Sequence, residues 1–181
     1  YVNRFDLSLG QAGMAAGIFG LLALFARALG GMVSDRIALS RGLDGRTMLL
    51  FALMLGEGLG LYWFSQAGGV AMAIFAMTVF GLFTHMACGA TYALVPFIDR
   101  QSLGGVAGII GAGGNVGAVC AGFLMKGMAD VPSCLAVLGV LVAISSLCAI
   151  AVRFTTEHKE REQALFEQAV SENAMRRAAL V

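Results

Sequence analysis

Charged side chains are scarce in this chain of 181 residues. Asp, Glu, Lys and Arg make up 13% of it, whereas soluble domains carry roughly 25%. Prolines number only two, while there are 25 glycines and 59% of the residues are hydrophobic. Such a composition suits helices packed within a bilayer. It therefore excludes an ordinary soluble domain and predicts an all-α membrane protein.

The sequence also lacks the patterns of metal centres and disulfide frameworks, because it contains no CxxC pair. We expect neither a metal nor an organic cofactor. The four cysteines all lie in apolar stretches, where we expect buried thiols that act as small apolar groups. The formal net charge of +1 gives no indication of a nucleic-acid partner.

Five apolar segments have the length of a bilayer crossing, which needs about 20 residues. Short connectors separate them, so neighbouring spans are predicted to run antiparallel. Together they form a transmembrane bundle over residues 1–153, followed by a charged tail over residues 154–181. The expected spans are Ala12–Val33, Met48–Phe64, Val70–Phe97, Leu103–Met125 and Pro132–Val152.

Basic residues fall mainly on one side of these spans. Arginines occur between the first and second spans, between the third and fourth, and after the fifth, whereas the other side holds only Arg4 and Lys126. The arginine-rich side is the cytoplasm by the positive-inside rule. We therefore expect the N-terminus outside and the tail in the cytoplasm.

The tail is a charged helix with a short apolar stripe. We favour a solvated cytoplasmic helix over a regulatory partner site. Its basic residues are interspersed with Glu, so a lipid-binding basic patch is not indicated. The stripe consists of Leu165, Phe166, Ala169 and Val170.

The fourth span is rich in glycine, and its small residues share one helix face. Small residues let two helix backbones approach closely. The pattern predicts either plain helix packing or a groove that passes a small ion, and the residues alone leave both open. The face consists of Gly104, Gly108, Gly111, Asn115, Ala118 and Gly122.

Arg27 lies inside the first span, where a charge is costly and is expected to face protein or water. Gly13, Gly17, Gly20 and Gly31 share its face, which leaves space for another group. A planar guanidinium can donate two parallel hydrogen bonds to a planar oxyanion. We therefore favour anion binding over snorkelling or a structural ion pair.

Glu57 and His85 also lie in the middle of spans. Each is expected either to pair with another buried polar group or to carry protons, since a histidine titrates near physiological pH. We favour structural pairing for both residues.

The segment between the first two spans reads GGMVSDRIALSRGLDGR and carries Gly31, Asp35, Arg36 and Arg46. We expect Asp35 to accept hydrogen bonds from a neighbouring helix N-terminus, where the helix dipole favours negative charge. Such a contact would latch a cytoplasmic gate. The other interpretation is that these charges simply set the orientation of the chain in the membrane, and the two roles are compatible.

This loop motif resembles the cytoplasmic loop of the major facilitator superfamily. The stretch ARALGGMVSDR resembles the eighth helix of its nitrate/nitrite porter family. The stretch GGVAGIIGAGGNVGAVCAGFL resembles the second glycine-rich signature of that family, in the eleventh helix, and ATYALVPFIDR is also similar to it. The resemblance runs from Leu9 to about Arg153 and implies that the five spans correspond to helices eight to twelve.

The resemblance implies that the first six helices are missing. The chain begins with Tyr1 rather than Met and shows no signal peptide, so we expect a fragment of a longer protein. In the family, one arginine from each half holds the anion, and Arg27 matches the arginine of this half. The glycine signature falls on Gly108, Gly111, Gly113, Gly114, Asn115 and Gly117.

The function implied is secondary active transport of nitrate or nitrite across the plasma membrane, by alternating access between two helix bundles. The implied partners are the anion, the lipid bilayer and the missing N-terminal half, and no enzymatic activity is implied. One alternative is a major facilitator transporter of another small anion. The other is a subunit of a membrane complex, although an electron-transfer anchor would need paired axial histidines and only His85 lies in a span.

Overall fold

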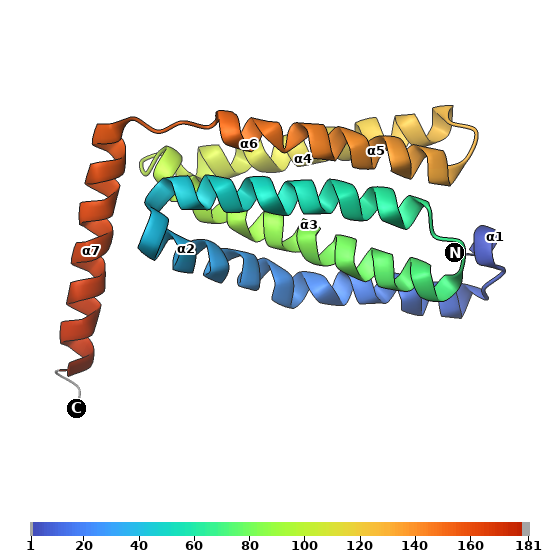
Figure 1. The fold of residues 1–181 in the computed structure, drawn as a ribbon, viewed down its shortest axis with the longest axis horizontal. Coiled ribbons are helices and arrows are strands. Elements are labelled where there is room, and N and C mark those ends of the chain that lie inside the picture. Colours follow the sequence, from blue (N-terminus) through green and yellow to red (C-terminus); the bar gives the residue numbers. More distant parts are fainter. Residues whose placement is uncertain (1, 179–181) are drawn as a thin grey trace.

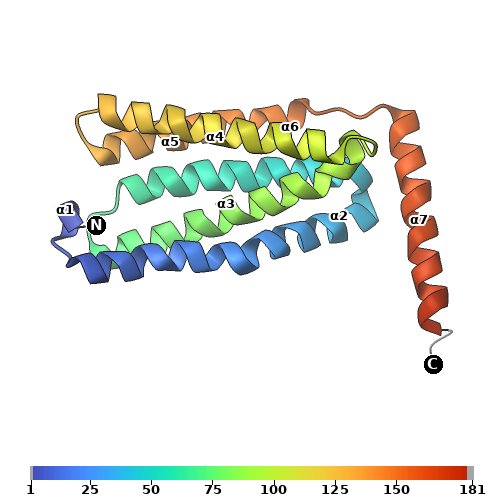
Figure 2. The ribbon, with the colours of Figure 1, turned by 180° about the vertical axis from the view of Figure 1, so that it is seen from behind.

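The computed structural model describes residues 2–178, and the regular structure of this part of the chain is entirely helical (Figure 1). Its helices lie side by side in a bundle, except for the last one, which crosses one end of the bundle in both views (Figure 2). We call this end the α7 end. The helices are α1 (Val2–Phe5), α2 (Leu9–Ser65), α3 (Val70–Ile98), α4 (Leu103–Gly127), α5 (Val131–Ser145), α6 (Leu147–Ala151) and α7 (Thr156–Ala178).

Helix α2 contains the first two expected spans and reverses its direction at the α7 end (Figure 1). The reversal lies at Gly42, where the backbone leaves helical geometry with φ 56° and ψ −146°. Glycine adopts such a positive φ at little cost, because it has no Cβ. The loop expected between Val33 and Met48 was therefore too long, because the chain is helical on both sides of Gly42.

Four described stretches are long and apolar enough to cross a membrane, namely α2, α3, α4 and the α5–α6 pair over Val131–Ala151. With its 57 residues, α2 is far longer than the roughly 20 residues that one crossing needs. The α5–α6 pair corresponds to the expected fifth span, with a local irregularity at Ser146, whose backbone keeps helical angles of φ −57° and ψ −29°. There the Ser146 hydroxyl donates to the Ala143 carbonyl at 2.6 Å.

Small residues bring the first half of α2 and helix α3 into backbone contact. A Cβ added at Gly30 would lie 2.1 Å from the Met86 carbonyl oxygen, and one at Gly89 would lie 1.9 Å from that of Arg27. Only glycine permits this spacing, because the helix backbones themselves touch. Gly30 belongs to a stripe of small buried residues on α2 that consists of Ala26, Gly30, Ser34 and Ala38.

A second close contact joins the other half of α2 to α5. A Cβ at Gly58 would lie 2.7 Å from the Gly139 carbonyl oxygen and 2.5 Å from the Ala143 nitrogen. The second half of α2 also packs against α3, since a Cβ at Gly60 would lie 3.1 Å from the Phe80 Cα. This half of α2 is therefore in contact with both α3 and α5.

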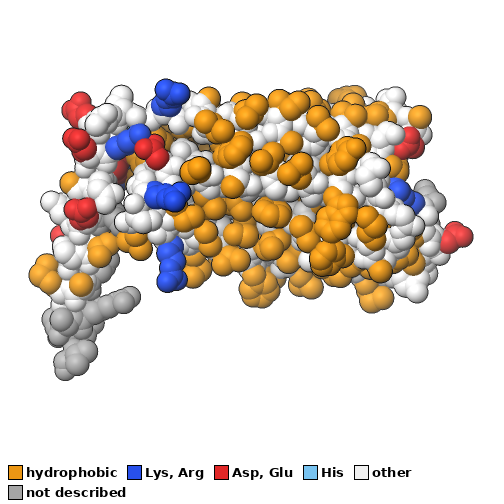
Figure 3. All heavy atoms as spheres, in the orientation of Figure 1, with side chains coloured by type: hydrophobic (Ala, Val, Ile, Leu, Met, Phe, Trp, Pro, Cys, Tyr) orange, Lys and Arg blue, Asp and Glu red, His pale blue; other side chains and the backbone are white. Residues whose placement is uncertain are grey.

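The outer surface of the bundle is apolar. Figure 3 shows hydrophobic side chains along one face of the bundle, with the charged side chains gathered toward its two ends. Such a surface suits hydrocarbon and would be costly in water. The expectation of buried thiols holds for Cys134 alone, since Cys120 and Cys148 are exposed and Cys88 is half-buried.

We predict that Gly30→Ala destabilises the bundle by about 1–3 kcal/mol, because the added methyl group overlaps the backbone of Met86. Thermal unfolding of the purified protein in detergent measures the effect. Gly20→Ala is the matched control on the same helix, because its Cβ would meet no described atom within 4 Å. Equal melting temperatures for the two variants would contradict the close crossing.

Candidate functional site

The side chain of Arg27 is exposed on the first half of α2. It makes no hydrogen bond or ion pair with any residue that the structure describes, so the ion-pair interpretation has no partner among them. Its backbone is nevertheless fixed, because the Arg27 carbonyl lies against Gly89 of α3. The same face is open, since a Cβ at Gly13, Gly17 or Gly20 would meet nothing within 4 Å. A held backbone with a free guanidinium is an arrangement that can bind an anion.

The glycine face of α4 is open in the same way. No residue of α4 is buried, and even Ile109 is 76% exposed. A Cβ added on this face would find no other part of the described chain within 4 Å, so the expected close approach is not made within residues 2–178. These glycines are Gly104, Gly108, Gly111 and Gly122, and the same holds for Gly113, Gly114 and Gly117 elsewhere on α4.

Asn115 is the polar member of this face. It is exposed and forms no hydrogen bond with a described residue. Neither hydrogen bonds nor ion pairs connect Arg27 to α4 in the described part of the chain, so the structure leaves these two candidate elements separate.

His85 and Glu57 each lie beside a polar partner on a neighbouring helix. The His85 Nε2 lies 3.0 Å from the Phe19 carbonyl oxygen, and its ring packs against the Phe19 ring at 4.7 Å. His85 thereby links α3 to the first half of α2. The Glu57 carboxyl faces the Thr84 hydroxyl on α3, which itself donates to the Phe80 carbonyl at 3.0 Å.

Arg46 is the most enclosed charge of the loop motif, with only 3% of its side chain exposed. Its Nη1 donates to the Asp35 carboxylate at 2.8 Å and to the Ser34 hydroxyl at 3.0 Å. Its guanidinium carbon lies 4.8 Å from the centre of the Phe97 ring at the end of α3. Asp35 thus pairs with a side chain, rather than with a helix N-terminus as expected. Arg46 therefore ties both halves of α2 to α3.

The other two members of the motif behave differently. Arg36 is exposed and has no hydrogen bond or ion pair to a described residue. Gly31 lies at the α2–α3 crossing, where its Cβ would be 3.9 Å from the Gly89 carbonyl oxygen.

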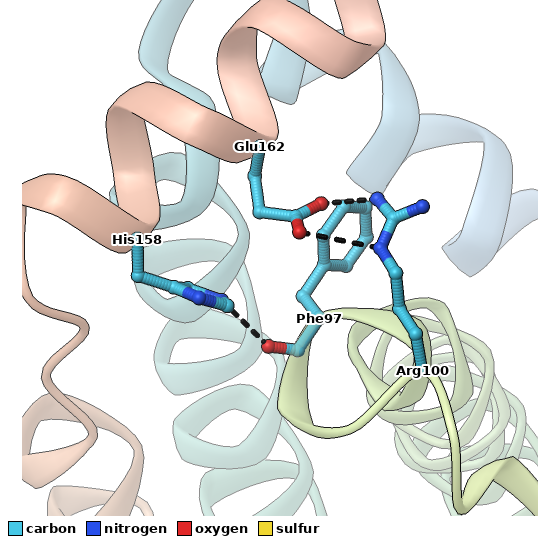
Figure 4. Close-up of polar contacts among 4 residues, drawn as sticks. All are labelled: Phe97, Arg100, His158 and Glu162. Carbon is cyan, nitrogen blue, oxygen red and sulfur yellow. Dashed lines mark hydrogen bonds and ion pairs between the residues drawn. The ribbon is translucent and has the colours of Figure 1, made fainter.

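Four residues of the α7 end were not singled out from the sequence as a site. Figure 4 shows Phe97, Arg100, His158 and Glu162 gathered at the junction of α3, α4 and α7. Arg100 was visible only as one of the basic residues that set the orientation. Its partner lies 62 residues away, and helical spacing reveals only neighbours three or four residues apart.

Comparison with known proteins identifies the family. The sequence model of the Major Facilitator Superfamily matches residues 1–180. The chain therefore belongs to this superfamily, whose members are transporters and not enzymes, and it is a multi-pass, all-helical membrane protein. No solved structure matches the chain significantly.

The curated relatives carry the names of nitrate transporters. High affinity nitrate transporter 2.5 of Arabidopsis thaliana is 42% identical over 119 residues, which are 66% of this chain and 24% of the relative. Nitrate/nitrite transporter NrtP of Nostoc punctiforme is 30% identical over 176 residues, which are 96% of this chain and 34% of the relative. The chain thus spans about a quarter to a third of the length of these two relatives.

We predict that Arg46→Ala destabilises the protein by about 3 kcal/mol, because a buried charge network loses its central member. Thermal unfolding in detergent measures the loss. Arg36→Ala removes an arginine from the same motif that is exposed and without a described partner, so it should leave the melting temperature unchanged. Equal melting temperatures for the two variants would mean that Arg46 serves only as a charge that sets the orientation of the chain in the membrane.

Proposed function

We propose that this chain is the C-terminal half of a plasma-membrane transporter of nitrate or nitrite. The relatives named above support the substrate, and the free guanidinium of Arg27 supports the site. Arg27 is the observation that carries the proposal, because it is a charge inside an apolar helix with its backbone fixed and no described partner. A planar anion could accept two parallel hydrogen bonds from it.

In this proposal the two halves of α2, then α3, α4 and the α5–α6 pair make five crossings, equivalent to helices eight to twelve. The α7 end faces the cytoplasm, because the connections at that end carry most of the arginines. The N-terminus is then outside, and α7 lies in the cytoplasm beyond the bundle of residues 1–153.

The anion would lie between this half and the missing N-terminal half. Two open surfaces support this arrangement, namely the face of Arg27 and the glycine face of α4. Neither has a partner within the described residues, and small residues permit close approach of a second bundle or of the anion itself. The two bundles would rock about this site to alternate access.

The pair of Asp35 and Arg46 would act as a latch at the cytoplasmic end of this half. Arg46 is buried, whereas the Asp35 side chain is 66% exposed. The carboxylate can therefore exchange its partner for water more readily than the guanidinium can. We assign His85 a structural role, because its ring already has a carbonyl partner and an aromatic neighbour.

Arg27→Lys tests the anion site in the full-length protein. Lysine keeps the charge but loses the planar fork, so we expect nitrate uptake to fall about tenfold or more while the protein still reaches the membrane. Uptake of labelled nitrate, corrected for the amount of protein at the cell surface, measures the change. Uptake near that of the unaltered protein would leave snorkelling as the better interpretation of Arg27.

Gly108→Leu tests the open face of α4. A Cβ at this position meets no described residue within 4 Å, so we attribute a loss of transport to a surface or ligand beyond the described contacts. We expect nitrate uptake to be abolished with normal expression. Ile109→Leu changes the adjacent exposed residue off this face and should preserve uptake. Equal uptake by both variants would remove the glycine face from the anion path.

A further inference from the structure

Among the described side chains, three polar contacts from one short stretch hold helix α7 on the bundle. The Glu162 carboxylate pairs with the Arg100 guanidinium, and the His158 Nε2 lies 2.9 Å from the Phe97 carbonyl oxygen (Figure 4). The Lys159 ammonium lies 2.7 Å from the Asp44 carboxylate. All three anchors of α7 thus lie within its first two turns.

The contact between Glu162 and Arg100 is the strongest of the three. Both carboxylate oxygens are engaged, with Nε donating to Oε1 at 3.2 Å and Nη2 donating to Oε2. Glu162 is 5% exposed, so its carboxylate would lose its counter-charge in a buried position if Arg100 moved away. Arg100 itself is 52% exposed, but its partner is buried, whereas Lys159 and Asp44 are 35% and 67% exposed. A salt bridge between exposed groups contributes little.

These anchors join two connections that are far apart in sequence. Asp44 belongs to the reversal of α2 at Gly42, whereas Phe97 and Arg100 belong to the end of α3 and its connection to α4. The Phe97 ring lies against both Arg46 and Arg100, at 4.8 and 5.9 Å from their guanidinium carbons. Helix α7 therefore fastens the α2 reversal to the start of α4.

Helix α4 is the element that this fastening would restrain most. None of its residues is buried, so its own packing against the bundle is weak. The connection that leads into it is ordered by Asp99, whose Oδ1 accepts hydrogen bonds from the Gln101 and Ser102 amides at 2.8 and 3.3 Å. The hydrogen bond from the Gln101 amide, and after it those from Ser102, lower the pKa of Asp99 below its usual value. The two amide bonds also close the connection as a turn. A restraint on Arg100 is thereby passed to the start of α4.

We propose that α7 is a strap that holds the start of α4 and slows its movement during transport. This inference rests on the proposed function, in which α4 lines the anion path. Release of Glu162 from Arg100 would free the start of α4 and raise the rate of turnover. The charged tail is then a brake built into the chain, rather than only a solvated appendage.

A reversible cross-link in the full-length protein tests the strap. In a cysteine-free background, Arg100→Cys and Glu162→Cys are combined and treated with a bifunctional methanethiosulfonate reagent. We expect uptake of labelled nitrate to rise about threefold in the untreated double variant, to fall below the unaltered level after cross-linking, and to rise again with dithiothreitol. Each single variant treated with the same reagent is the control, and its uptake should not fall.

A substitution pair provides the second test. Glu162→Gln removes the charge that holds Arg100, and we expect the initial rate of uptake to rise about threefold at equal surface amount. Glu172→Gln removes an exposed carboxylate from the same helix and should change nothing. Uptake that stays equal or falls in Glu162→Gln, or a cross-link that forms without slowing uptake, would overturn the strap and leave the proposed function intact. Absence of nitrate uptake by the unaltered protein would instead contradict the proposed function itself.

Discussion

The backbone contact between the first half of α2 and α3 is the constraint on which the other features depend. Gly30 and Gly89 allow the two helices to touch where side chains would normally separate them. Packing between apolar helices in a bilayer gains little from the hydrophobic effect, so close van der Waals contact has to hold them. Because Arg27 lies at this contact, its backbone cannot shift without separating the two helices.

Tight and loose packing are divided between different helices of the bundle. At the α7 end, Arg46 joins the two halves of α2 to α3 through an ion pair, a hydroxyl group and an aromatic ring. Helix α4 has none of this support along its length and depends on its connections. The structure thus combines a tightly joined part, made of α2, α3 and α5, with one helix that is free to adjust.

Several features could be predicted from the sequence because they depend on local patterns. Hydropathy alone located the apolar segments, and the glycine signature and loop motif pointed to the family, which the comparisons confirm. The reversal at Gly42 was predicted only as part of a long loop between the apolar spans, because hydropathy marks membrane-length segments and not the helical turns beyond them. Asp35 and Arg46 lie on such helical turns.

Other features were out of reach because they depend on partners distant in sequence. The glycines of α4 drew attention by their number, yet the close crossings occur elsewhere, at Gly30 and at Gly58. A small residue at every fourth position from Ala26 to Ala38 was the available signal for the first crossing. No comparable pattern in the sequence indicated the carbonyl partner of His85 or the carboxylate partner of Arg100.

The exposure of α4 also has a consequence for the order of assembly. Helices in a bilayer form individually before they associate. Helices α2, α3 and α5 can complete their mutual contacts as soon as this half is inserted, whereas the glycine face of α4 finds no surface to settle against within it. On the proposed architecture the N-terminal half is synthesised first. Its surface would then already be in the membrane when α4 emerges, so α4 could settle against that surface while α5 is still being synthesised.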